Sequence, residues 1–247
     1  MAIVKCNWSG GKDSSCATHL HLTQGDKCIV VNYIPMFTKE IPMLLKVHYE
    51  FIMQTAEKFR QMGAKVYQPE GITYWDFVHL RNVKGENKGR IKGFPPFITG
   101  ACNFKTFSKE KALNSLDKQL NYDYQDIGIA FDEKKRHNQL SEKKRSILVE
   151  KKIIEHNAVE YCKRNGIYSP HYSVLKRDGC TLCPQAPTTE RIMWFEDYPD
   201  AFGLVLELQN FVKIERPEQN PLRNYRWFIE EDLQMNMFDK GTRWIIN

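Results

Sequence analysis

A short polar segment near the N-terminus combines glycine, lysine and hydroxyl side chains, which are the residue types that bind phosphate groups. Its residues are Ser9, Gly10, Gly11, Lys12, Asp13, Ser14 and Ser15. Adjacent glycines let a backbone turn sharply and bring its N–H groups close to phosphate oxygens. The segment joins a predicted strand over residues 2–7 to a predicted helix over residues 12–23, whose positive end adds to the charge of Lys12. These features predict a triphosphate site.

The segment differs from two common phosphate-binding motifs. It lacks the Gly-Lys-Ser/Thr ending of a Walker A loop, because Asp13 follows Lys12, and it lacks the spaced glycines of a dinucleotide fingerprint. An ordinary kinase or dehydrogenase is therefore not expected. A glycine-rich strand-to-helix turn without a ligand is the alternative interpretation, and we favour the phosphate site because strand, glycines, lysine and hydroxyls occur together.

A second polar group follows another predicted strand, over residues 126–131. Asp132, Glu133 and Arg136 come directly after that strand. Ligands of open α/β sheets bind beyond the carboxyl ends of the strands, so we expect this group to lie at the same edge as the first segment. Asp132 or Glu133 could hold Mg²⁺ through water, and Arg136 could stabilise phosphate charge. The alternative is a strand end that opens into a charged surface helix.

Three cysteines are candidate metal ligands. Cys180 and Cys183 have the Cys-x-x-Cys spacing that lets two sulfurs face one metal, and Cys102 is the candidate third ligand. An iron–sulfur cluster of the 4Fe-4S type, a zinc ion with His171 as a candidate fourth ligand, a redox dithiol and two buried thiols all remain open. The other four cysteines fall in predicted strands or helices and are expected to be buried: Cys6, Cys16, Cys28 and Cys162.

Predicted strands and helices alternate along most of the chain. After the first strand and helix, the pattern predicts strands over residues 28–34, 64–67 and 126–131 and helices over residues 44–62 and 109–120. This alternation predicts an α/β fold with a Rossmann-like parallel sheet and helices on both faces. Residues 82–100 are rich in Gly, Lys and Pro and are expected to form a long loop over an active site.

Length and composition limit the class of protein. The 247 residues predict one domain over residues 1–183 and a small, mainly helical extension over residues 184–247, with helical pieces at 198–212 and 222–237. No apolar run is long enough to cross a bilayer and no secretion signal is evident, so we expect a cytoplasmic protein without a membrane role. The formal net charge is +6, and Lys and Arg cluster in residues 82–92 and 134–152. These clusters could track a polyanion, or they could be solvated surfaces.

Three motifs carry a resemblance to a known family. Residues 9–14 match the Ser-Gly-Gly-x-Asp-Ser pattern and resemble the PP-loop of the N-type ATP pyrophosphatases. Residues 128–136 resemble the Gly-x-x-x-Asp-Glu-x-x-Arg segment of the phosphoadenosine phosphosulfate (PAPS) reductase-like family within that superfamily, and residues 179–184 with Cys102 resemble its cysteine motif. The resemblance extends from about Ala2 to Pro184 and implies an adenine nucleotide alpha hydrolase-like fold.

The resemblance implies an enzyme of the adenylyltransferase type that binds ATP and Mg²⁺ at the PP-loop, adenylates a substrate and releases pyrophosphate. It implies catalytic roles for Lys12, Asp13, Asp132, Glu133 and Arg136, and a place in sulfur transfer or nucleic-acid modification, with DNA or RNA as acceptor and a sulfur-donor protein as partner. A sulfonucleotide (PAPS or APS) as a small substrate and a nucleotide-binding module without chemistry are the alternatives.

Two departures from the family narrow this expectation. Residues 184–247 contain no cysteine, whereas true sulfonucleotide reductases carry a nucleophilic Cys near the C-terminus, so a reductase is not expected. Residues 32–35, Asn-Tyr-Ile-Pro, stand where the family has Asp-Thr-Gly, which leaves the substrate contacts of that loop open.

Overall fold

The computed structural model describes residues 2–95, 97–98, 101–138, 140–183 and 186–219. The chain divides into two compact units. The sheet unit comprises Met1–Ile34, Val47–Glu70 and Leu113–Asp178, and the second unit comprises Pro35–Lys46, Gly71–Ala112 and Gly179–Asn247. This division differs from the single boundary predicted after residue 183, because loops that leave the sheet contribute to the second unit as well.

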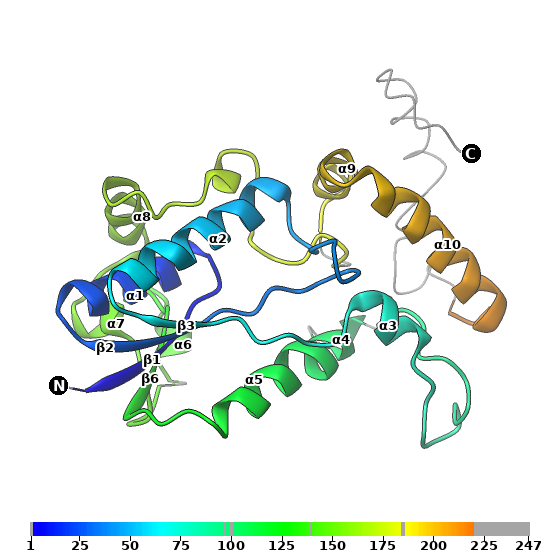
Figure 1. Cartoon of the computed structure of the whole chain (residues 1–247), viewed down its shortest axis with the longest axis horizontal. Coiled ribbons are helices and arrows are strands. Elements are labelled where there is room, and N and C mark those ends of the chain that lie inside the picture. The colour runs from blue at the N-terminus through cyan, green and yellow to red at the C-terminus, as the bar shows by residue number, and fades with distance from the viewer. Residues whose placement is uncertain (1, 96, 99–100, 139, 184–185, 220–247) are drawn as a thin grey trace. The chain divides into compact units, whose positions relative to one another are not determined.

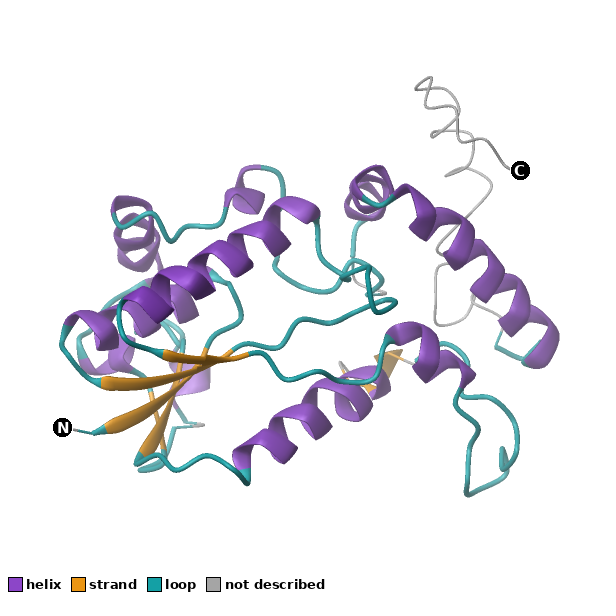
Figure 2. Cartoon of the chain, in the orientation of Figure 1, coloured by secondary structure: helices purple, strands orange, loops and turns teal. Residues whose placement is uncertain are grey.

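Among the described residues, five parallel strands form the sheet of the first unit, which confirms the predicted parallel α/β architecture. The strands are β1 (Ile3–Asn7), β2 (Lys27–Val31), β3 (Lys65–Tyr67), β6 (Tyr124–Ile127) and β7 (Lys144–Arg145). Their order in the sheet is β3-β2-β1-β6-β7. Figure 2 shows the strands in orange, with helices flanking them.

Helices alternate with the strands of the sheet unit, and the apolar patterns predict the first two of them. The helices are α1 (Lys12–Thr23), α2 (Lys46–Gln61), α5 (Lys111–Asp117), α6 (Lys134–His137), α7 (Ile147–Glu150) and α8 (Glu155–Arg164). In Figure 1, α1 and α2 lie on the same side of the sheet. Phe51, Ile52, Ala56 and Phe59 form the buried face of α2, and the ring of Phe59 packs edge-on against Trp8 with centroids 5.1 Å apart.

The buried thiols are where the sequence predicts them. Cys6, Cys16, Cys28 and Cys162 are all buried, in β1, α1, β2 and α8 respectively. Strands of a parallel sheet covered on both faces need such small apolar side chains.

Several element boundaries differ from the predictions. The strand predicted over residues 126–131 runs from Tyr124 to Ile127, because the chain turns away at Gly128. The helix predicted over residues 109–120 consists of a π-helical turn, Thr106–Glu110, followed by α5. The pattern did not predict β7, whose two residues are exposed and carry no apolar signal, or α8.

The second unit is mainly helical and has an aromatic core. Its elements include α3 (Tyr74–His79), the antiparallel pair β4 (Phe97–Ile98) and β5 (Ala101–Cys102), α4 (Asn103–Lys105), α9 (Thr188–Asp197) and α10 (Pro199–Glu215). The ring of Phe37 packs against Tyr74 and Trp194, and Trp194 Nε1 donates a hydrogen bond to the Pro42 carbonyl over 2.8 Å.

The predicted helical pieces after residue 197 and the predicted loop 82–100 are only partly described by the structure. The helical piece predicted at residues 198–212 is present as α10, whereas the piece predicted at residues 222–237 lies outside the described residues. The predicted loop 82–100 is irregular up to the bridge between Arg81 and Ile91, and β4 follows it. That this loop covers an active site stays a prediction.

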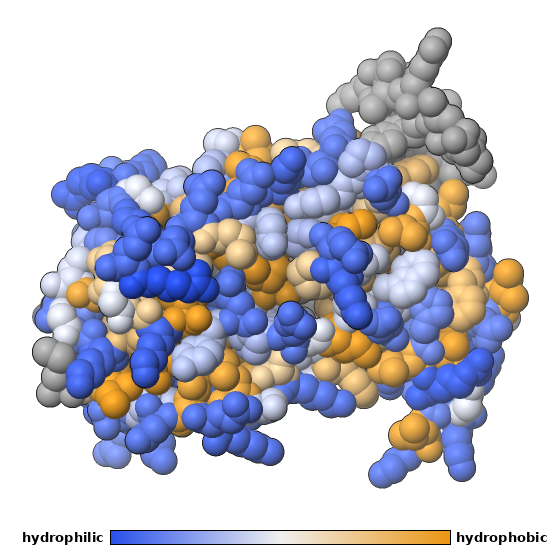
Figure 3. Space-filling view, in the orientation of Figure 1, coloured by the Kyte–Doolittle hydropathy of each residue, from blue (hydrophilic) through white to orange (hydrophobic). Residues whose placement is uncertain are grey.

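None of the helices among the described residues is both long and apolar enough to cross a lipid bilayer. The molecular face drawn in Figure 3 is mainly hydrophilic, with apolar residues interspersed.

Candidate anion-binding site

The first polar segment lies at the point of the sheet where the strand order reverses. β1 has β2 on one side and β6 on the other. From β1 the chain builds the sheet outward through β2 and β3, and then returns to add β6 and β7 beside β1 on the opposite side. In open α/β sheets such a switch point leaves a crevice at the carboxyl ends of the strands, where ligands bind. Both polar groups predicted from the sequence follow the two strands that border this point.

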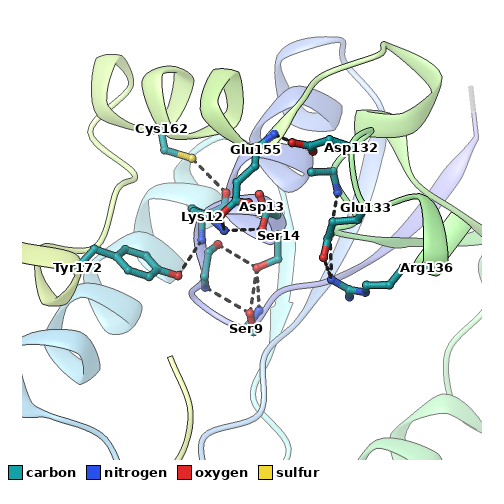
Figure 4. A network of polar contacts seen from close by, with 12 residues as sticks. Ser9, Lys12, Asp13, Ser14, Asp132, Glu133, Arg136, Glu155, Cys162 and Tyr172 are labelled. Carbon is teal, nitrogen blue, oxygen red and sulfur yellow. Dashed lines mark hydrogen bonds and ion pairs between the residues drawn. The ribbon is translucent and has the colours of Figure 1, made fainter. Parts of the chain in front are cut away.

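Hydrogen bonds of its own side chains and of the neighbouring Trp8 hold the segment of residues 9–15 in shape. The buried Trp8 indole donates to Ser15 Oγ over 2.8 Å. Ser14 Oγ accepts from the Ser9 amide at 3.2 Å and donates to the Gly11 carbonyl at 3.0 Å, as Figure 4 shows. These bonds give the segment a defined shape. Helix α1 begins within it, at Lys12.

Two glycines of the site have conformations or contacts that exclude a side chain. Gly10 has φ +85°, and a Cβ there would lie 2.7 Å from Ile52 Cγ1. Gly128 lies directly after β6, where a Cβ would lie 2.5 Å from the Ser14 amide nitrogen and 2.7 Å from Ser14 Cα. The start of the second motif is thus packed against the first turn of α1.

Lys12 is held by two carboxylates. Its Nζ lies 2.9 Å from Asp13 Oδ2 and 2.9 Å from Glu155 Oε1, the second from the first turn of α8. Partial burial opposes the charge of Lys12, but the two carboxylates outweigh it and raise the pKa of the ammonium. Lys12 is therefore cationic throughout the physiological range.

The two carboxylate oxygens of Asp13 differ in their contacts: Oδ2 pairs with Lys12, and Oδ1 does not. Burial raises the pKa of Asp13, and the hydrogen bond from Lys12 counteracts only part of that effect. Its Oδ1 is buried and, among the described residues, has no hydrogen-bond partner. A buried acceptor without a donor suits a cation or a hydrated Mg²⁺ ion, so Asp13 fits the metal that the family resemblance implies.

Asp132, Glu133 and Arg136 of the second motif do not share one set of contacts. Arg136 Nη1 pairs with Glu133, at 2.7 Å from Oε1 and 2.9 Å from Oε2, and Glu133 also accepts from the Ala130 amide at 3.1 Å. Asp132 is exposed and accepts from the Glu155 amide at 3.0 Å, where α8 begins. Glu133 and Arg136 therefore face the loop, whereas Asp132 caps a neighbouring helix.

A cavity of about 380 Å³ opens beside the loop, and its lining is formed entirely by polar side chains and glycine. The loop and α1 contribute Ser9, Gly11, Lys12, Asp13 and Ser14. More distant segments contribute Gly128, Glu133, Arg136, Tyr172, Lys176 and Asp178. Three cations and three carboxylates thus line this space, and two of the cations, Lys12 and Arg136, form ion pairs with carboxylates.

Sequence reasoning did not assign Tyr172, Asp178 or Glu155 to this site. Tyr172 Oη accepts from the Lys12 amide at 3.3 Å, and burial followed by the charge of Asp178 raises the pKa of its phenol. Each of these residues is more than 100 positions from Lys12 along the chain. Asp178 ends residues 176–178, directly before the cysteine motif, and this position is the signal by which the sequence could have indicated it.

Two buried histidines share one hydroxyl beneath the loop. Ser169 Oγ lies 2.9 Å from His48 Nδ1 and 2.7 Å from His171 Nδ1, and the two rings are 4.0 Å apart. Burial, together with the neighbouring His171, lowers the pKa of His48 to about 3, and burial also lowers the pKa of His171. His171 is thus a buried, neutral residue of the sheet unit, and its role as a candidate fourth zinc ligand stays a prediction.

The three candidate metal-binding cysteines are half-buried. Cys180 and Cys183 lie in one turn, in which the Cys183 amide donates to the Cys180 carbonyl over 3.0 Å, and Cys102 ends β5. Within the described residues, no three His, Cys, Asp or Glu side chains come together in a way that could hold a metal ion. The metal centre therefore stays a prediction, and no chemical step is assigned to it.

Comparison with known proteins does not assign this chain to a family. No protein-family model matches this chain, and no curated protein matches it as a relative.

Proposed function

We propose that the protein binds Mg·ATP in the cavity beside residues 9–15 and transfers the adenylyl group to an acceptor, with release of pyrophosphate. The observation that carries the proposal is the contact of Gly128 with Ser14, which places both polar groups around one cavity at the switch point of a parallel sheet. That arrangement supports an adenine nucleotide alpha hydrolase-like class within the α/β fold.

The proposed chemistry is an in-line displacement at the α-phosphorus. An acceptor oxygen forms a bond to this phosphorus while the bond to the oxygen that bridges to the β-phosphate breaks. The electron pair leaves with pyrophosphate, and any proton on the acceptor oxygen passes to solvent. The step requires neutralisation of the charge that develops on pyrophosphate.

Residues on two sides of the cavity are suited to that task. Lys12 and Arg136 are two of its three cations. Both are paired with carboxylates, and phosphate oxygens would compete with those carboxylates for them. Asp13, with its unpaired Oδ1, would hold Mg²⁺, which supplies further neutralisation of phosphate charge when it is bound.

We propose nucleic acid, DNA or RNA, as the acceptor. The support is the basic segment of residues 134–152, whose exposed Lys134, Lys135, Lys143 and Lys144 follow directly from the cavity wall. Adenylation of an oxygen prepares it for replacement by a sulfur nucleophile, which a sulfur-donor protein would supply. A sulfonucleotide is the second candidate acceptor, because a few cations also bind a small phosphorylated molecule.

The deciding experiment incubates the protein with ATP, Mg²⁺ and either DNA, tRNA or a sulfonucleotide under anaerobic conditions. We expect AMP and pyrophosphate with the correct acceptor, and we expect Lys12→Ala and Arg136→Ala to abolish both products. Lys27→Ala is the matched control, since Lys27 is exposed at the opposite, amino end of β2. ADP as the sole product would exclude adenylation, and nucleotide binding without any product would indicate a non-catalytic module.

A further inference from the structure

A second cavity, of about 450 Å³, lies within the second unit, and its lining residues differ in type from those of the first cavity. Its lining residues are Ile72, Leu80, Arg81, Val83, Lys92, Phe107 and Lys111. Every ionisable group in this lining is a cation, and the remaining side chains are apolar. The first cavity, by contrast, balances its cations with carboxylates.

Two of the cations lie close to one aromatic ring. Lys92 Nζ is 4.2 Å and Lys111 Nζ is 4.4 Å from the centroid of the Phe107 ring. The ring face attracts each ammonium, but the two ammonium groups repel each other. Burial, followed by the charge of Lys111, lowers the pKa of Lys92. A bound anion would remove this repulsion.

The hydrogen bonds recorded for these cations go to neutral oxygens. Lys92 Nζ donates to Asn82 Oδ1 at 3.3 Å, and Arg81 Nη1 donates to the Gly89 carbonyl at 2.7 Å. The nearest acidic residue in sequence, Glu110, pairs with Lys105 at 3.6 Å. Within the described part of the chain, no carboxylate forms an ion pair with Arg81, Lys92 or Lys111.

The apolar wall of the cavity indicates what accompanies the anion. Ile72, Leu80 and Val83 line the space beside the cations, and Val83 is 78% exposed. An inorganic ion would leave this wall in water. An anion attached to a flat or apolar body would cover it, and a guanidinium with two ammonium groups suits the several oxygens of a phosphate group.

We infer that this cavity binds the phosphate group of a nucleotide, with the sugar or base against the apolar wall. The nucleotide is either free or part of a nucleic-acid strand, and both sources present the same phosphate chemistry. This inference concerns binding by the second unit. It rests on the proposed function in one respect: a nucleic-acid strand bound here would be part of the DNA or RNA that accepts the adenylyl group.

The test measures binding of a fluorescein-labelled single-stranded oligonucleotide in the absence of ATP. We expect Lys92→Gln/Lys111→Gln to weaken binding at least tenfold at low salt. Each phosphate contact on a single strand contributes about 0.7 to the log–log salt slope, so loss of this one phosphate site in the double variant should lower that slope by about 0.7. Lys39→Gln is the control, because Lys39 is exposed in the same unit and outside this lining.

Competition identifies the source of the phosphate. Displacement of the oligonucleotide by a mononucleotide at similar concentration indicates a free nucleotide as the ligand, whereas displacement by unlabelled strands alone indicates nucleic acid. Unchanged affinity in the double variant, or no binding of either probe by the wild-type protein, would overturn the inference. Arg81→Gln, whose recorded side-chain bond is to one exposed carbonyl, provides a second test if the double variant does not fold.

This inference and the proposed function fail independently. Lys12→Ala should leave oligonucleotide binding intact while it abolishes adenylation. If AMP never forms but the lysine variants still lose binding, the adenylation proposal fails and the phosphate site stands.

Discussion

Gly128 and Ser14 meet backbone to backbone, and a Cβ on residue 128 would lie 2.5 Å from the Ser14 amide nitrogen. This contact joins the end of β6 to the first turn of α1. Because Ser14 also holds the segment of residues 9–15 through its hydroxyl, a displacement at Gly128 would pass directly to that segment. The absence of a side chain at one position thus sets the geometry of the cavity.

Replacing Gly128 should therefore damage both stability and binding. We expect Gly128→Ala to lower the free energy of unfolding by about 1–3 kcal/mol, as overpacking of a tight contact does, and to weaken ATP binding. Gly203→Ala in α10 is the control, since no atom lies within 4 Å of its Cβ position, and it should stabilise the helix by about 0.5–1 kcal/mol. Urea denaturation and nucleotide titration measure the two effects. Equal responses of the two variants would contradict the close approach.

Glu155 forms an ion pair with Lys12, and we expect it to compete with phosphate for that ammonium. We expect Glu155→Gln to tighten ATP binding by roughly two- to fivefold, because it removes a negative charge 2.9 Å from the Lys12 ammonium. Glu160→Gln, on the same helix and paired with Lys163, should leave the dissociation constant unchanged. Isothermal titration with ATP and Mg²⁺ provides the comparison. Weaker binding in Glu155→Gln would show that the ion pair positions Lys12 for the ligand instead of competing with it.

The buried His48 predicts a loss of stability in acid. Its pKa is lowered from 6.5 to about 3 in the folded protein, so between these values the unfolded chain binds the proton more readily. The stability that neutral His48 supports is complete above about pH 6.5 and declines as the pH falls toward 3, by at most about 1.4 kcal/mol per pH unit. Urea denaturation over this range should show a shallower decline in His48→Gln than in the wild-type protein. Parallel curves would argue against a neutral buried His48.

Asp126 links α1 to the segment after β7. Its Oδ2 accepts from the Ile147 amide at 2.8 Å and lies 3.1 Å from His21 Nε2, inside the core. We expect Asp126→Asn to reduce the free energy of unfolding by about 1–3 kcal/mol, because a charged acceptor of a buried amide is lost.

The same variant should change the pH dependence on the alkaline side. Burial works against protonated His21, but Asp126 and Asp26 outweigh it and raise the pKa of its imidazole. The stability contributed by protonated His21 is complete below its unfolded pKa of about 6.5 and is lost as the pH rises through the folded pKa. Denaturation curves above pH 6.5 should show a weaker decline in Asp126→Asn, and an unchanged decline would remove Asp126 as the cause.

The cysteine motif predicts a metal centre that the described residues do not assemble. We expect protein purified without oxygen to retain iron with sulfide, or zinc, and Cys183→Ser to lose it. Cys28→Ala is the control, since Cys28 is buried in β2. Metal analysis together with a visible absorption spectrum distinguishes the two metals. Metal-free wild-type protein would exclude the centre.

Local sequence determined the elements that depend on neighbouring residues. Helix α1 has the predicted bounds, Lys12–Thr23, because the glycines before it and the turn at Gly25 mark its ends. The apolar runs of β1 and β2 and the four buried thiols follow from the same short-range patterns. The strand–helix alternation then suffices to predict a parallel sheet.

The tertiary structure alone decided which distant residues meet at the loop. Adjacent Asp132 and Glu133 look equivalent in sequence, yet one caps α8 and the other lines the cavity. Glu155 and Tyr172 reach Lys12 because α8 and the turn after it pack beside α1, a placement that depends on burial of whole helix faces. The spacing of residues along the sequence does not predict such contacts. They depend on the free energy of burying apolar surface, to which many residues far apart in the chain contribute.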